Sequence, residues 1–387
     1  MTPLRHRGGQ RLVQWDSPAT VPREWALIEH AKGRALGSGS QVTLVITTFD
    51  RPDYLLECLA SVQNQTLTGF RLVVLDNSSV ADYSGVLDRF RDLPMTYVRN
   101  ETNLGAAGNI GKAMRQYADS KYLMVFHDDD LMHPRMLEWQ FQALEASPEI
   151  QFVSTELAAF HDGDEPPTRI WENVGLEIEV YDDQSALARS LVRSGGLCFG
   201  STMYRSSVLK QIRIDEERFG IVWDRPFLLD AARLGKSALL RAPLVLYRHH
   251  PGQDTNTGSL SAKNLIELMK AYRAALPAHW SRADEQLFYR HSSGFLTRNG
   301  YSRLAPGERI GAATFIRKAI RNKVLRLRDV SPGGWETLMR ADGKRALPNA
   351  IDAARSASRR FLPRQRLASG FQPASIGERG PRRSPEE

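Results

Sequence analysis

The sequence predicts an α/β fold with a mostly parallel central sheet, and three observations carry this prediction. Strand patterns alternate with helical patterns from about residue 42 to residue 145. The strand patterns are continuous apolar runs, which are typical of strands covered on both faces. Polar and acidic residues follow these runs, at the sheet edge where open α/β folds bind their ligands. Such alternation builds a parallel sheet with helices on both sides.

The first two predicted strands both end in polar residues. Residues 42–48 form a run rich in β-branched side chains, as expected for a buried strand. Pro52 then suits the first position of a helix. A second run, residues 70–75, leads into Asp76. Because parallel strands end at the same edge of a sheet, we expect Thr48 and Asp76 to share that edge.

Two further strands complete the pattern. Residues 96–98 form a short strand, and the sequence Asn-Leu-Gly-Ala-Ala-Gly-Asn at 103–109 opens a helix over 110–117. Residues 122–127 fit a strand buried on both faces. The turn after the first strand lacks Gly-x-Gly-x-x-Gly, and no Gly-x-x-x-x-Gly-Lys-Ser/Thr occurs. These absences exclude dinucleotide-binding dehydrogenases and P-loop enzymes.

Three consecutive carboxylates, Asp128, Asp129 and Asp130, follow the fourth strand. Adjacent carboxylates raise each other's pKa values unless a cation lies among them. If the extended geometry persists, alternation places Asp128 and Asp130 on one side. Two hard oxygen ligands of this kind indicate a site for Mg²⁺ or Mn²⁺ beside a nucleotide diphosphate. The alternative is a solvated acidic turn before a helix that begins near Pro134.

Composition indicates a soluble globular protein without disulfides. The hydrophobic share is 42% and the charged share 25%, and no apolar run approaches the roughly 20 residues that span a bilayer. The polar N-terminus does not resemble a secretory signal, and two distant cysteines favour a reducing cytoplasm. The net charge of +8 favours anionic partners. No zinc-finger or aromatic RNA-binding pattern accompanies it, which argues against nucleic acid.

One basic stretch in the C-terminal third has two possible roles. The C-terminal helical region includes an amphipathic basic stretch, Pro306 to Arg328. One interpretation of this stretch is peripheral contact with an anionic membrane at its inner face; the other is packing on the catalytic domain.

The predicted organisation has four parts. They are an N-terminal extension and linker (1–40), a catalytic domain (41–255, with halves 41–145 and 146–255), a helical extension (256–350) and a disordered basic tail (351–387).

Four stretches, in this order, resemble the family 2 glycosyltransferases, whose nucleotide-sugar-binding fold is called GT-A. They are residues 42–52, 73–78, 103–109 and 127–134. The resemblance covers about residues 41–255. It implies a metal-dependent inverting enzyme that moves one sugar from a nucleotide-diphosphate sugar to an acceptor hydroxyl in glycan, glycolipid or glycoconjugate biosynthesis. The Gln-x-x-Arg-Trp pattern of processive polysaccharide synthases is absent, which favours transfer of one sugar per binding event.

The resemblance assigns donor contacts to residues near the strand ends. Thr48 and Asp76 would contact the base and ribose of the nucleotide. A strand-end Asx turn is the alternative for Asp76. Asn103, Gly105 and Asn109 would shape the wall beside the diphosphate. A turn followed by a helix N-cap accounts equally for these three residues.

The acidic cluster matches the metal motif of the family, often written DXD. Asp128 and Asp130 are its first and third members and the expected ligands of Mn²⁺ or Mg²⁺, and Asp128 and Asp129 are expected at the nucleotide sugar. Which carboxylate bonds the metal stays open. His250, just after an apolar strand, resembles the family histidine near the metal and diphosphate. An ordinary surface histidine is the alternative.

The second half supplies the candidate catalytic base, Asp224. Residues 219–235 match the family segment that places an aspartate at a helix start. A positioned carboxylate can take the proton of an acceptor hydroxyl as the new C–O bond forms. The family usually has Glu-Asp where this chain has Trp223 and Asp224, which puts acceptor positioning in question. A plain helix N-cap is the alternative role.

Two other functions compete with glycosyl transfer. A nucleotidyltransferase of related fold would need a Gly-rich, Arg/Lys-bearing loop after the first strand, and residues 49–52 do not form one. A non-catalytic nucleotide-sugar-binding scaffold would have no use for the acidic cluster together with Asp224. The sequence therefore favours a glycosyltransferase with a hydroxyl acceptor on a glycan, a lipid-linked group or a small molecule.

Overall fold

The computed structural model describes residues 10–15, 40–172, 174–194, 197–253, 261–277, 281–302, 310–326 and 329–330. All of these belong to one structural unit, Met1–Ser331. The second unit, Pro332–Glu387, lies outside the described residues. The predicted disordered tail, 351–387, and most of the predicted extension and linker, 1–40, fall outside them as well.

Four parallel strands form one half of the central sheet. The strands predicted at 42–48 and 122–127 have the predicted bounds, and the other two differ by one residue at each end. Side chains on both faces of the middle strands are buried, as the apolar runs predict. In sheet order the strands are β4 (Met95–Arg99), β3 (Arg71–Asp76), β2 (Val42–Thr48) and β5 (Tyr122–His127).

The other half of the sheet is mixed. β9 (Met203–Arg205) is antiparallel to both β5 and β7 (Ile150–His161), and β7 is parallel to β10 (Lys236–His249). The remaining strands pair antiparallel: β6 (Leu131–Met132) and β8 (Leu176–Tyr181) with β10, and β1 (Gln10–Trp15) with β8. The sequence did not predict β1, whose partner lies more than 150 residues further along the chain.

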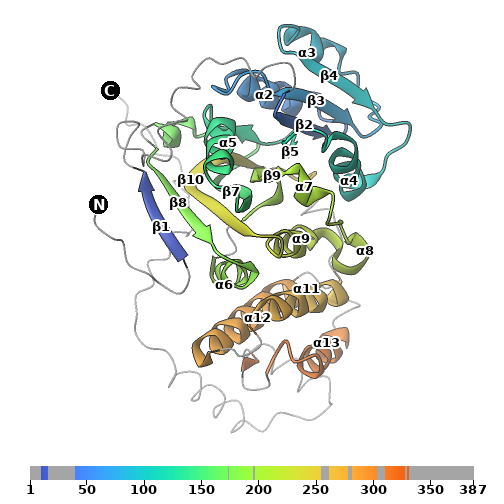
Figure 1. Ribbon diagram of the computed structural model, residues 1–387. Helices are drawn as coiled ribbons and strands as arrows, with labels where there is room; N and C mark the ends of the chain where they lie inside the picture. The colour runs from blue at the N-terminus through green and yellow to red at the C-terminus, as the bar shows by residue number, and fades with distance from the viewer. Residues whose placement is uncertain are drawn as a thin grey trace, which may run out of the picture. The chain divides into compact units, whose positions relative to one another are not determined.

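Helices flank the strands of the first half (Figure 1). They are α2 (Pro52–Gln63), α3 (Ser84–Arg89), α4 (Gly105–Tyr117) and α5 (Met136–Ala146). α2 buries an apolar face, on which Leu55, Leu59 and Val62 are at most 1% exposed. Pro52 occupies the start of this helix, where its missing N–H costs nothing.

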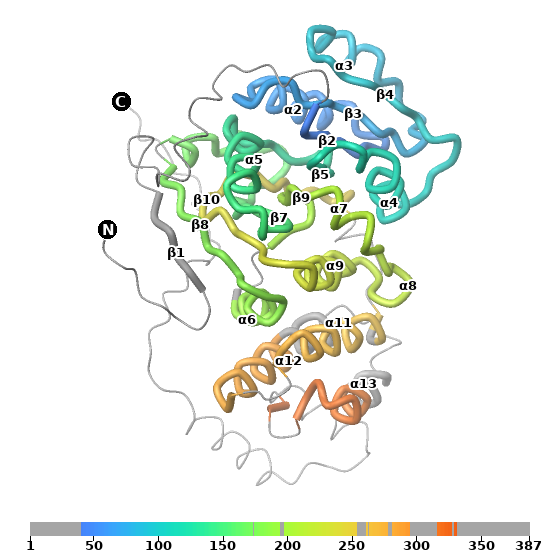
Figure 2. The backbone as a smooth tube through the Cα atoms, viewed as in Figure 1, coloured from blue at the N-terminus to red at the C-terminus, as the bar shows by residue number. Residues whose placement is uncertain are grey.

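Short elements follow along the second half of the chain, which Figure 2 traces from green to yellow. This half brings the candidate base, Asp224, to the start of a helix. The helices are α6 (Gln184–Ser194), α7 (Ser206–Leu209), α8 (Glu216–Phe219) and α9 (Asp224–Ala231), with 3-10 turns η1 (Thr168–Trp171), η2 (Phe199–Ser201) and η3 (Gly220–Val222).

Three C-terminal helices follow, α11 (Ala262–Ala275), α12 (Arg282–Ser302) and α13 (Ile310–Arg321) (Figure 1). α11 packs against α6, α8 and α9, α12 packs against α6 and α11, and α13 packs against α12. Among the predicted amphipathic residues, Ile316 and Val324 are buried and Arg317 is exposed. The carbonyl oxygen of Val324 accepts from the hydroxyl of Ser292 on α12. The described apolar residues therefore pack against α12 within the helical extension, and both packing on the catalytic domain and contact with a membrane stay predictions.

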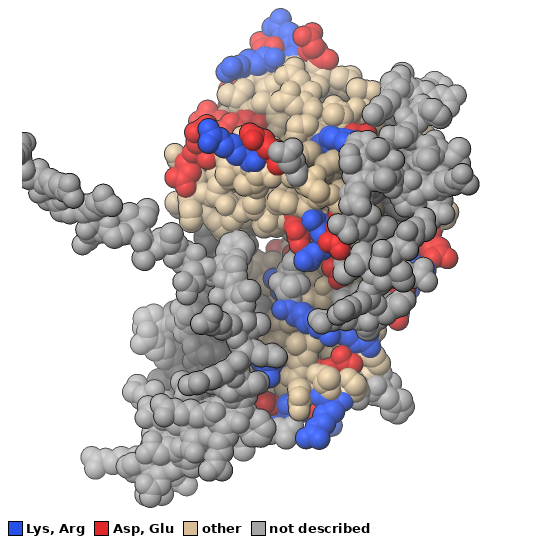
Figure 3. Space-filling model, turned by 90° about the vertical axis from the view of Figure 1, so that its left-hand side faces the viewer, with Lys and Arg blue, Asp and Glu red and all other residues tan. Residues whose placement is uncertain are grey.

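The surface of the described residues carries both signs of charge. On the face drawn in Figure 3, Lys and Arg side chains lie close to Asp and Glu side chains. None of the helices in the described ranges combines the length and the apolar character needed to cross a bilayer.

Candidate active site

The ends of β2 and β3 meet as predicted. Thr48 and Asp76 are register partners in this strand pair. Oγ1 of Thr48 donates a hydrogen bond to Oδ2 of Asp128 at 2.6 Å. The same hydroxyl lies 2.8 Å from the phenolic oxygen of Tyr83. The end of β2 is thereby bonded directly to the first carboxylate after β5.

Asp76 is fully buried, and both of its carboxylate oxygens are bonded within the protein. Oδ1 accepts from the backbone N–H of Ser79 at 2.9 Å, which is the strand-end turn that the sequence allows as an alternative. Oδ2 accepts from the hydroxyl of Tyr97 at 2.6 Å, and Nε of Arg99 lies 3.7 Å away. A nucleotide base could reach this carboxylate only if Tyr97 or Arg99 moved.

Asn103, Gly105 and Asn109 belong to one amide network at the start of α4. Asn103 and Gly105 are exposed, and Oδ1 of Asn103 accepts from Nδ2 of Asn77 and from the N–H of Gly105, both at 2.8 Å. Gly105 has a φ of 71°, which favours glycine. Asn109 is 2% exposed and donates to the carbonyl oxygen of Leu75. Asn103 and Gly105 can line a site, whereas Asn109 holds α4 against β3.

The Arg51 guanidinium and the His250 imidazole converge on Asp129. Nη1 of Arg51 lies 3.0 Å from Oδ2 of Asp129 and 3.5 Å from Oδ1 of Asp128. Nε2 of His250 lies 3.0 Å from the same Oδ2 of Asp129. Nη2 of Arg51 also donates to the carbonyl oxygen of Gly252 at 2.7 Å. Arg51 thus ties the acidic cluster to the segment that follows β10.

Asp130 faces a different neighbour. Its Oδ1 accepts from the backbone N–H of Arg248 at 3.0 Å, and Nε of Arg248 donates to the carbonyl oxygen of Asp129 at 3.0 Å. The Arg248 side chain is buried, and its guanidinium carbon lies 4.8 Å from the ring centre of Tyr54 and 4.6 Å from that of Phe160. Arg248 therefore fixes the backbone and side chain at the end of the acidic cluster.

The extended geometry of β5 does not persist through the cluster. The strand ends at His127, and Asp128 and Asp129 form a turn. Alternation therefore stops before it can place Asp128 and Asp130 on one side, because a turn rotates successive side chains differently from a strand. Asp128 faces the end of β2, whereas Asp130 faces β10.

The three carboxyl groups differ in how readily they ionise. Burial and the charge of Asp129 raise the pKa of Asp128 to about 7, although Arg51 lowers it in part. Burial and the charge of Asp129 also raise the pKa of Asp130 well above its usual range. Burial acts against ionisation of Asp129 too, but its hydrogen bond with His250 and nearby positive charges hold its pKa below the usual value. Asp129 is therefore the carboxylate that stays ionised.

The donor types for a divalent ion are present at this site. Asp128 and Asp129 both present an oxygen to Arg51, and His250 contacts Asp129. Two carboxylate oxygens and an imidazole nitrogen suit Mn²⁺, and the oxygens suit Mg²⁺. Across the described ranges, no group of three His, Cys, Asp or Glu side chains is already arranged to hold a metal. An ion bound here would occupy the place of the Arg51 guanidinium.

Asp224 lies at the start of α9 and is half-buried. Burial raises the pKa of its carboxyl group, and the neighbouring Arg225 guanidinium opposes this shift. Nη1 of Arg225 lies 3.4 Å from the hydroxyl oxygen of Tyr272 on α11. The C-terminal helices thus contact the residue that adjoins the candidate base.

Trp223, where the family usually has Glu, belongs to an aromatic cluster. Its ring centre lies 5.0 Å from that of Phe199 and 5.9 Å from that of Phe227, both at edge-to-face angles. Such pairs stabilise packing beyond the area that they bury. The departure therefore replaces a carboxylate with a buried anchor for the start of α9.

His127 lies between the two parts of the site. A positive charge on its ring would lower the pKa values of both the Asp129 and the Asp224 carboxyl groups. Its Nε2 is buried and has no hydrogen-bond partner within the part of the chain that the structure describes. A β-carbon added at Gly200 would lie 3.2 Å from Cδ2 of His127, so the glycine makes room for the ring.

Sequence reasoning missed three contributors to the site: Arg51, His127 and Arg248. Arg51 and His127 lie inside stretches already singled out, so their positions beside strand ends were a usable signal. Arg248 precedes His250 by two residues, but nothing in the sequence indicates that its backbone N–H reaches Asp130.

Comparison with known proteins points to glycosyltransferases. Residues 43–213 match the family model described as glycosyl transferase family 2. Protein CgeD of Bacillus subtilis is 26% identical over 194 residues, which cover 48% of this chain and 42% of CgeD. An uncharacterized glycosyltransferase of Methanocaldococcus jannaschii is 31% identical over 116 residues, covering 29% of this chain and 40% of the relative. These matches span about two fifths of the relatives' lengths.

A solved structure shares the fold. S. aureus TarS, residues 1–349, in complex with UDP-GlcNAc has a TM-score of 0.56 and 17% sequence identity. The similarity covers 84% of this chain and 93% of that chain. The fold and the acidic strand end define an α/β protein of the GT-A class. Residues 43–213 of this chain are similar to the family 2 glycosyltransferases.

Proposed function

We propose that this chain is a metal-dependent, inverting glycosyltransferase that moves one sugar from a nucleotide-diphosphate sugar to an acceptor hydroxyl. The observation that carries this proposal is the position of His127 at the end of β5, within electrostatic range of both Asp129 and Asp224. The acidic cluster and the candidate base therefore adjoin one site. A donor bound on one side and an acceptor on the other would bring the reacting atoms between them.

The donor would bind along the ends of β2, β3 and β5. Thr48 and Asp76 are the proposed contacts to base and ribose, with Tyr97 or Arg99 moving to expose Asp76. Asn103 and Gly105 are exposed beside them and would line the diphosphate side. Asn109 would act through α4, because it is buried.

Asp128, Asp129 and His250 would hold the divalent ion, Mn²⁺ or Mg²⁺, and Asp130 would support them from behind through its bond to Arg248. When bound, such an ion stabilises the negative charge of a leaving diphosphate. Arg51 would leave the carboxylates and become available to the phosphates, for which its guanidinium is well suited.

Asp224 would act as the general base. Its raised pKa lies closer to neutral pH than that of an exposed aspartate, which favours proton transfer in the transition state. The acceptor oxygen loses its proton to Asp224 and bonds the anomeric carbon. The bond from that carbon to the diphosphate oxygen breaks with inversion, through an oxocarbenium-like transition state.

The test begins with binding. Titration of UDP, TDP and GDP in the presence and absence of Mn²⁺ should give heat for at least one diphosphate, and only weak binding without the ion. A panel of nucleotide sugars then identifies the donor, and the anomeric configuration of the product is read by NMR. Absence of binding by every diphosphate with Mn²⁺ would contradict the proposal. Release of pyrophosphate from a nucleoside triphosphate would favour a nucleotidyltransferase instead.

The catalytic variant is Asp224→Asn, and its matched control is Asp230→Asn. Both aspartates lie on α9, but Asp230 is exposed beside Arg233. We expect Asp224→Asn to bind the donor normally and to lose transfer. Equal transfer by the two variants would remove Asp224 from its assigned role. Contact with a membrane and location at its inner face stay predictions.

A further inference from the structure

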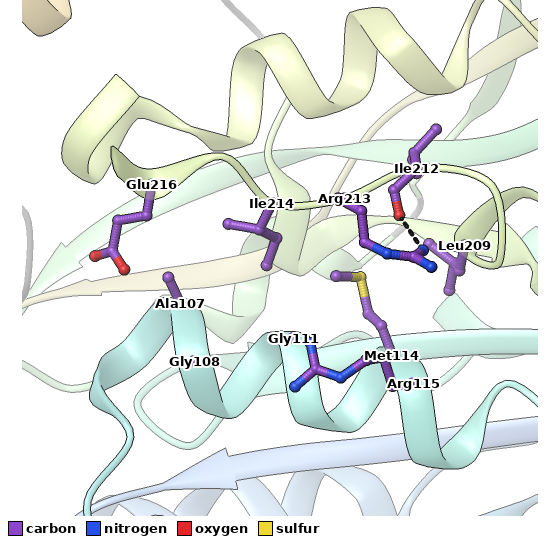
Figure 4. Close-up of a pocket in the computed structure, with 10 residues that line it drawn as sticks. All are labelled: Ala107, Gly108, Gly111, Met114, Arg115, Leu209, Ile212, Arg213, Ile214 and Glu216. Atoms are coloured by element: carbon purple, nitrogen blue, oxygen red, sulfur yellow. Dashed lines mark hydrogen bonds between the residues drawn. The ribbon is translucent and has the colours of Figure 1, made fainter. Parts of the chain in front are cut away.

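A cavity of about 200 Å³ lies between α4 and the segment that links α7 to α8 (Figure 4). Its walls are about equally apolar and polar, and charged side chains form part of the lining. It is smaller than the roughly 300 Å³ of a typical small-molecule site, so it suits one part of a ligand. The lining residues are Ala107, Gly108, Gly111, Met114, Arg115, Leu209, Ile212, Arg213, Ile214 and Glu216.

Glycine on α4 makes this cavity possible. A β-carbon added at Gly111 would lie 3.1 Å from Nη1 of Arg115 and 4.0 Å from Cδ1 of Ile214. The Arg115 guanidinium therefore folds back over the helix in space that a side chain at Gly111 would fill. The hollow and the position of its charged group both depend on that glycine.

Two guanidinium groups border the cavity, one on each side of Met114 in Figure 4. Arg213 donates to the carbonyl oxygens of Lys210 and Ile212 at 3.2 and 2.9 Å, which fixes its orientation. Among the described residues, neither Arg115 nor Arg213 forms an ion pair with a carboxylate. Guanidinium groups with free donors beside an apolar wall match a phosphate or carboxylate on a small organic body.

The opposite end of the cavity lies near the start of α4. Figure 4 shows Glu216 over Ala107, near the start of α4. The start of α4 follows β4 and so lies at the sheet edge that carries the acidic cluster. Glu216 begins α8, and the chain passes through η3 directly to Asp224. A ligand anchored at the arginines could therefore extend toward the candidate base.

We infer that this cavity is the acceptor subsite and that it binds an anionic group of the acceptor, a phosphate or a carboxylate. This inference rests on the proposed function. Arg115 and Arg213 bind the anionic group, the walls formed by Met114 and Ile214 cover the adjoining body, and the hydroxyl to be glycosylated extends past Glu216. The acceptor is then a small organic acid or phosphate ester, or the matching end of a larger molecule.

Direct titration tests the inference without any transfer assay. Glycerol 3-phosphate serves as the phosphate probe, glycerate as the carboxylate probe and inorganic phosphate as the free-ion probe, each titrated into the full chain. We expect one of the two organic anions to bind more tightly than inorganic phosphate, and its identity names the acceptor's anionic group. No binding by either organic probe, or equal binding by inorganic phosphate, would overturn the inference.

The variant with both arginines changed, Arg115→Gln with Arg213→Gln, should weaken this binding by at least about tenfold, which corresponds to about 1.4 kcal/mol. The matched control is Arg89→Gln with Arg193→Gln, which removes two exposed arginines elsewhere and should leave binding unchanged. A cavity-filling variant, Ile214→Trp, should block the probe while circular dichroism and melting temperature verify folding. Similar binding by all variants would place the anion outside this cavity.

Titration of nucleoside diphosphate with Mn²⁺ into the same variants separates the two proposals. If the arginine variants keep the wild-type affinity for the diphosphate and lose the organic anion, the subsite and the donor site are independent. If the wild-type chain binds the diphosphate but no organic anion, only the subsite fails. If it binds the organic anion but no diphosphate, the proposed transfer function fails and the cavity remains an anion site.

Discussion

Nη1 of Arg51 lies 3.0 Å from Oδ2 of Asp129, and 78 residues separate the two in the sequence. This ion pair links the loop after β2 to the turn after β5. It supplies positive charge to a cluster of three buried carboxyl groups. The pair therefore connects the stability of the protein to the proposed binding of a divalent ion.

Replacing Arg51 should destabilise the protein and increase its stabilisation by Mn²⁺. Arg51→Gln leaves the buried carboxylates with less positive charge, and we expect a loss of about 1–3 kcal/mol in the free energy of unfolding. Urea denaturation measures it. Addition of Mn²⁺ should restore more stability to this variant than to the wild type, because the ion no longer competes with the guanidinium. Arg91→Gln, which removes an exposed pair with Asp88, is the control and should cost less than about 1 kcal/mol.

Asp224→Asn should stabilise the protein while it removes activity. Because burial raises the folded-state pKa of Asp224, its contribution to stability is present below the ordinary value near 3.9 and is lost as pH rises through the raised value. Asparagine cannot ionise, so the Asp224→Asn variant does not lose this stability. Its free energy of unfolding in urea should therefore exceed that of the wild type by more at pH 7 than at pH 4. Its turnover should fall about 10²- to 10⁴-fold. An advantage independent of pH would contradict the assignment.

Arg225→Gln should move the pH profile of transfer. The guanidinium favours the charged carboxylate, so its removal raises the pKa of Asp224 further. We expect the acidic limb of kcat/KM to shift to higher pH, with turnover at the plateau less affected. Arg233→Gln, at the end of the same helix and exposed, should leave the limb unchanged. If the acidic limb of the pH profile does not move in Arg225→Gln, Arg225 does not lower the pKa of Asp224.

Arg248→Ala should be among the most destabilising substitutions of a buried residue in the described part of the chain. The side chain is 3% exposed, lies against Tyr54 and Phe160, and bonds the backbone of Asp129. Removing it leaves buried polar groups unpaired, for which we expect a loss of about 3–5 kcal/mol in urea denaturation. Arg241→Ala, an exposed position on the same strand, should cost about 1 kcal/mol or less.

Gly200→Ala should act on His127. The added β-carbon would lie 3.2 Å from Cδ2 of the imidazole, which is closer than ordinary packing allows. We expect a loss of about 1–3 kcal/mol in stability from overpacking, together with reduced transfer as the ring shifts. Gly85→Ala, on α3 with open space around it, is the control and should stabilise by about 0.5–1 kcal/mol. Unchanged transfer in Gly200→Ala would argue against a functional role for the position of His127.

Much of the nucleotide-binding half could be predicted from local patterns. The runs at 42–48 and 122–127 have the predicted strand bounds, because a strand buried on both faces requires consecutive apolar residues. The mixed half was harder to predict. β1 is six residues long and, among the described strands, pairs with β8 alone, so no local signal separates it from a loop.

The amino-acid sequence by itself determined that polar residues follow apolar strands and that three carboxylates follow the central one, since burial and chain order are local properties. Only the tertiary structure decided how those carboxylates are used. Asp129 faces Arg51 and His250, and the latter lies 121 residues away, whereas Asp130 turns to the backbone of Arg248. The physical reason is that β6, directly after the acidic turn, pairs antiparallel with β10, and contacts across such sequence separations depend on the assembled sheet.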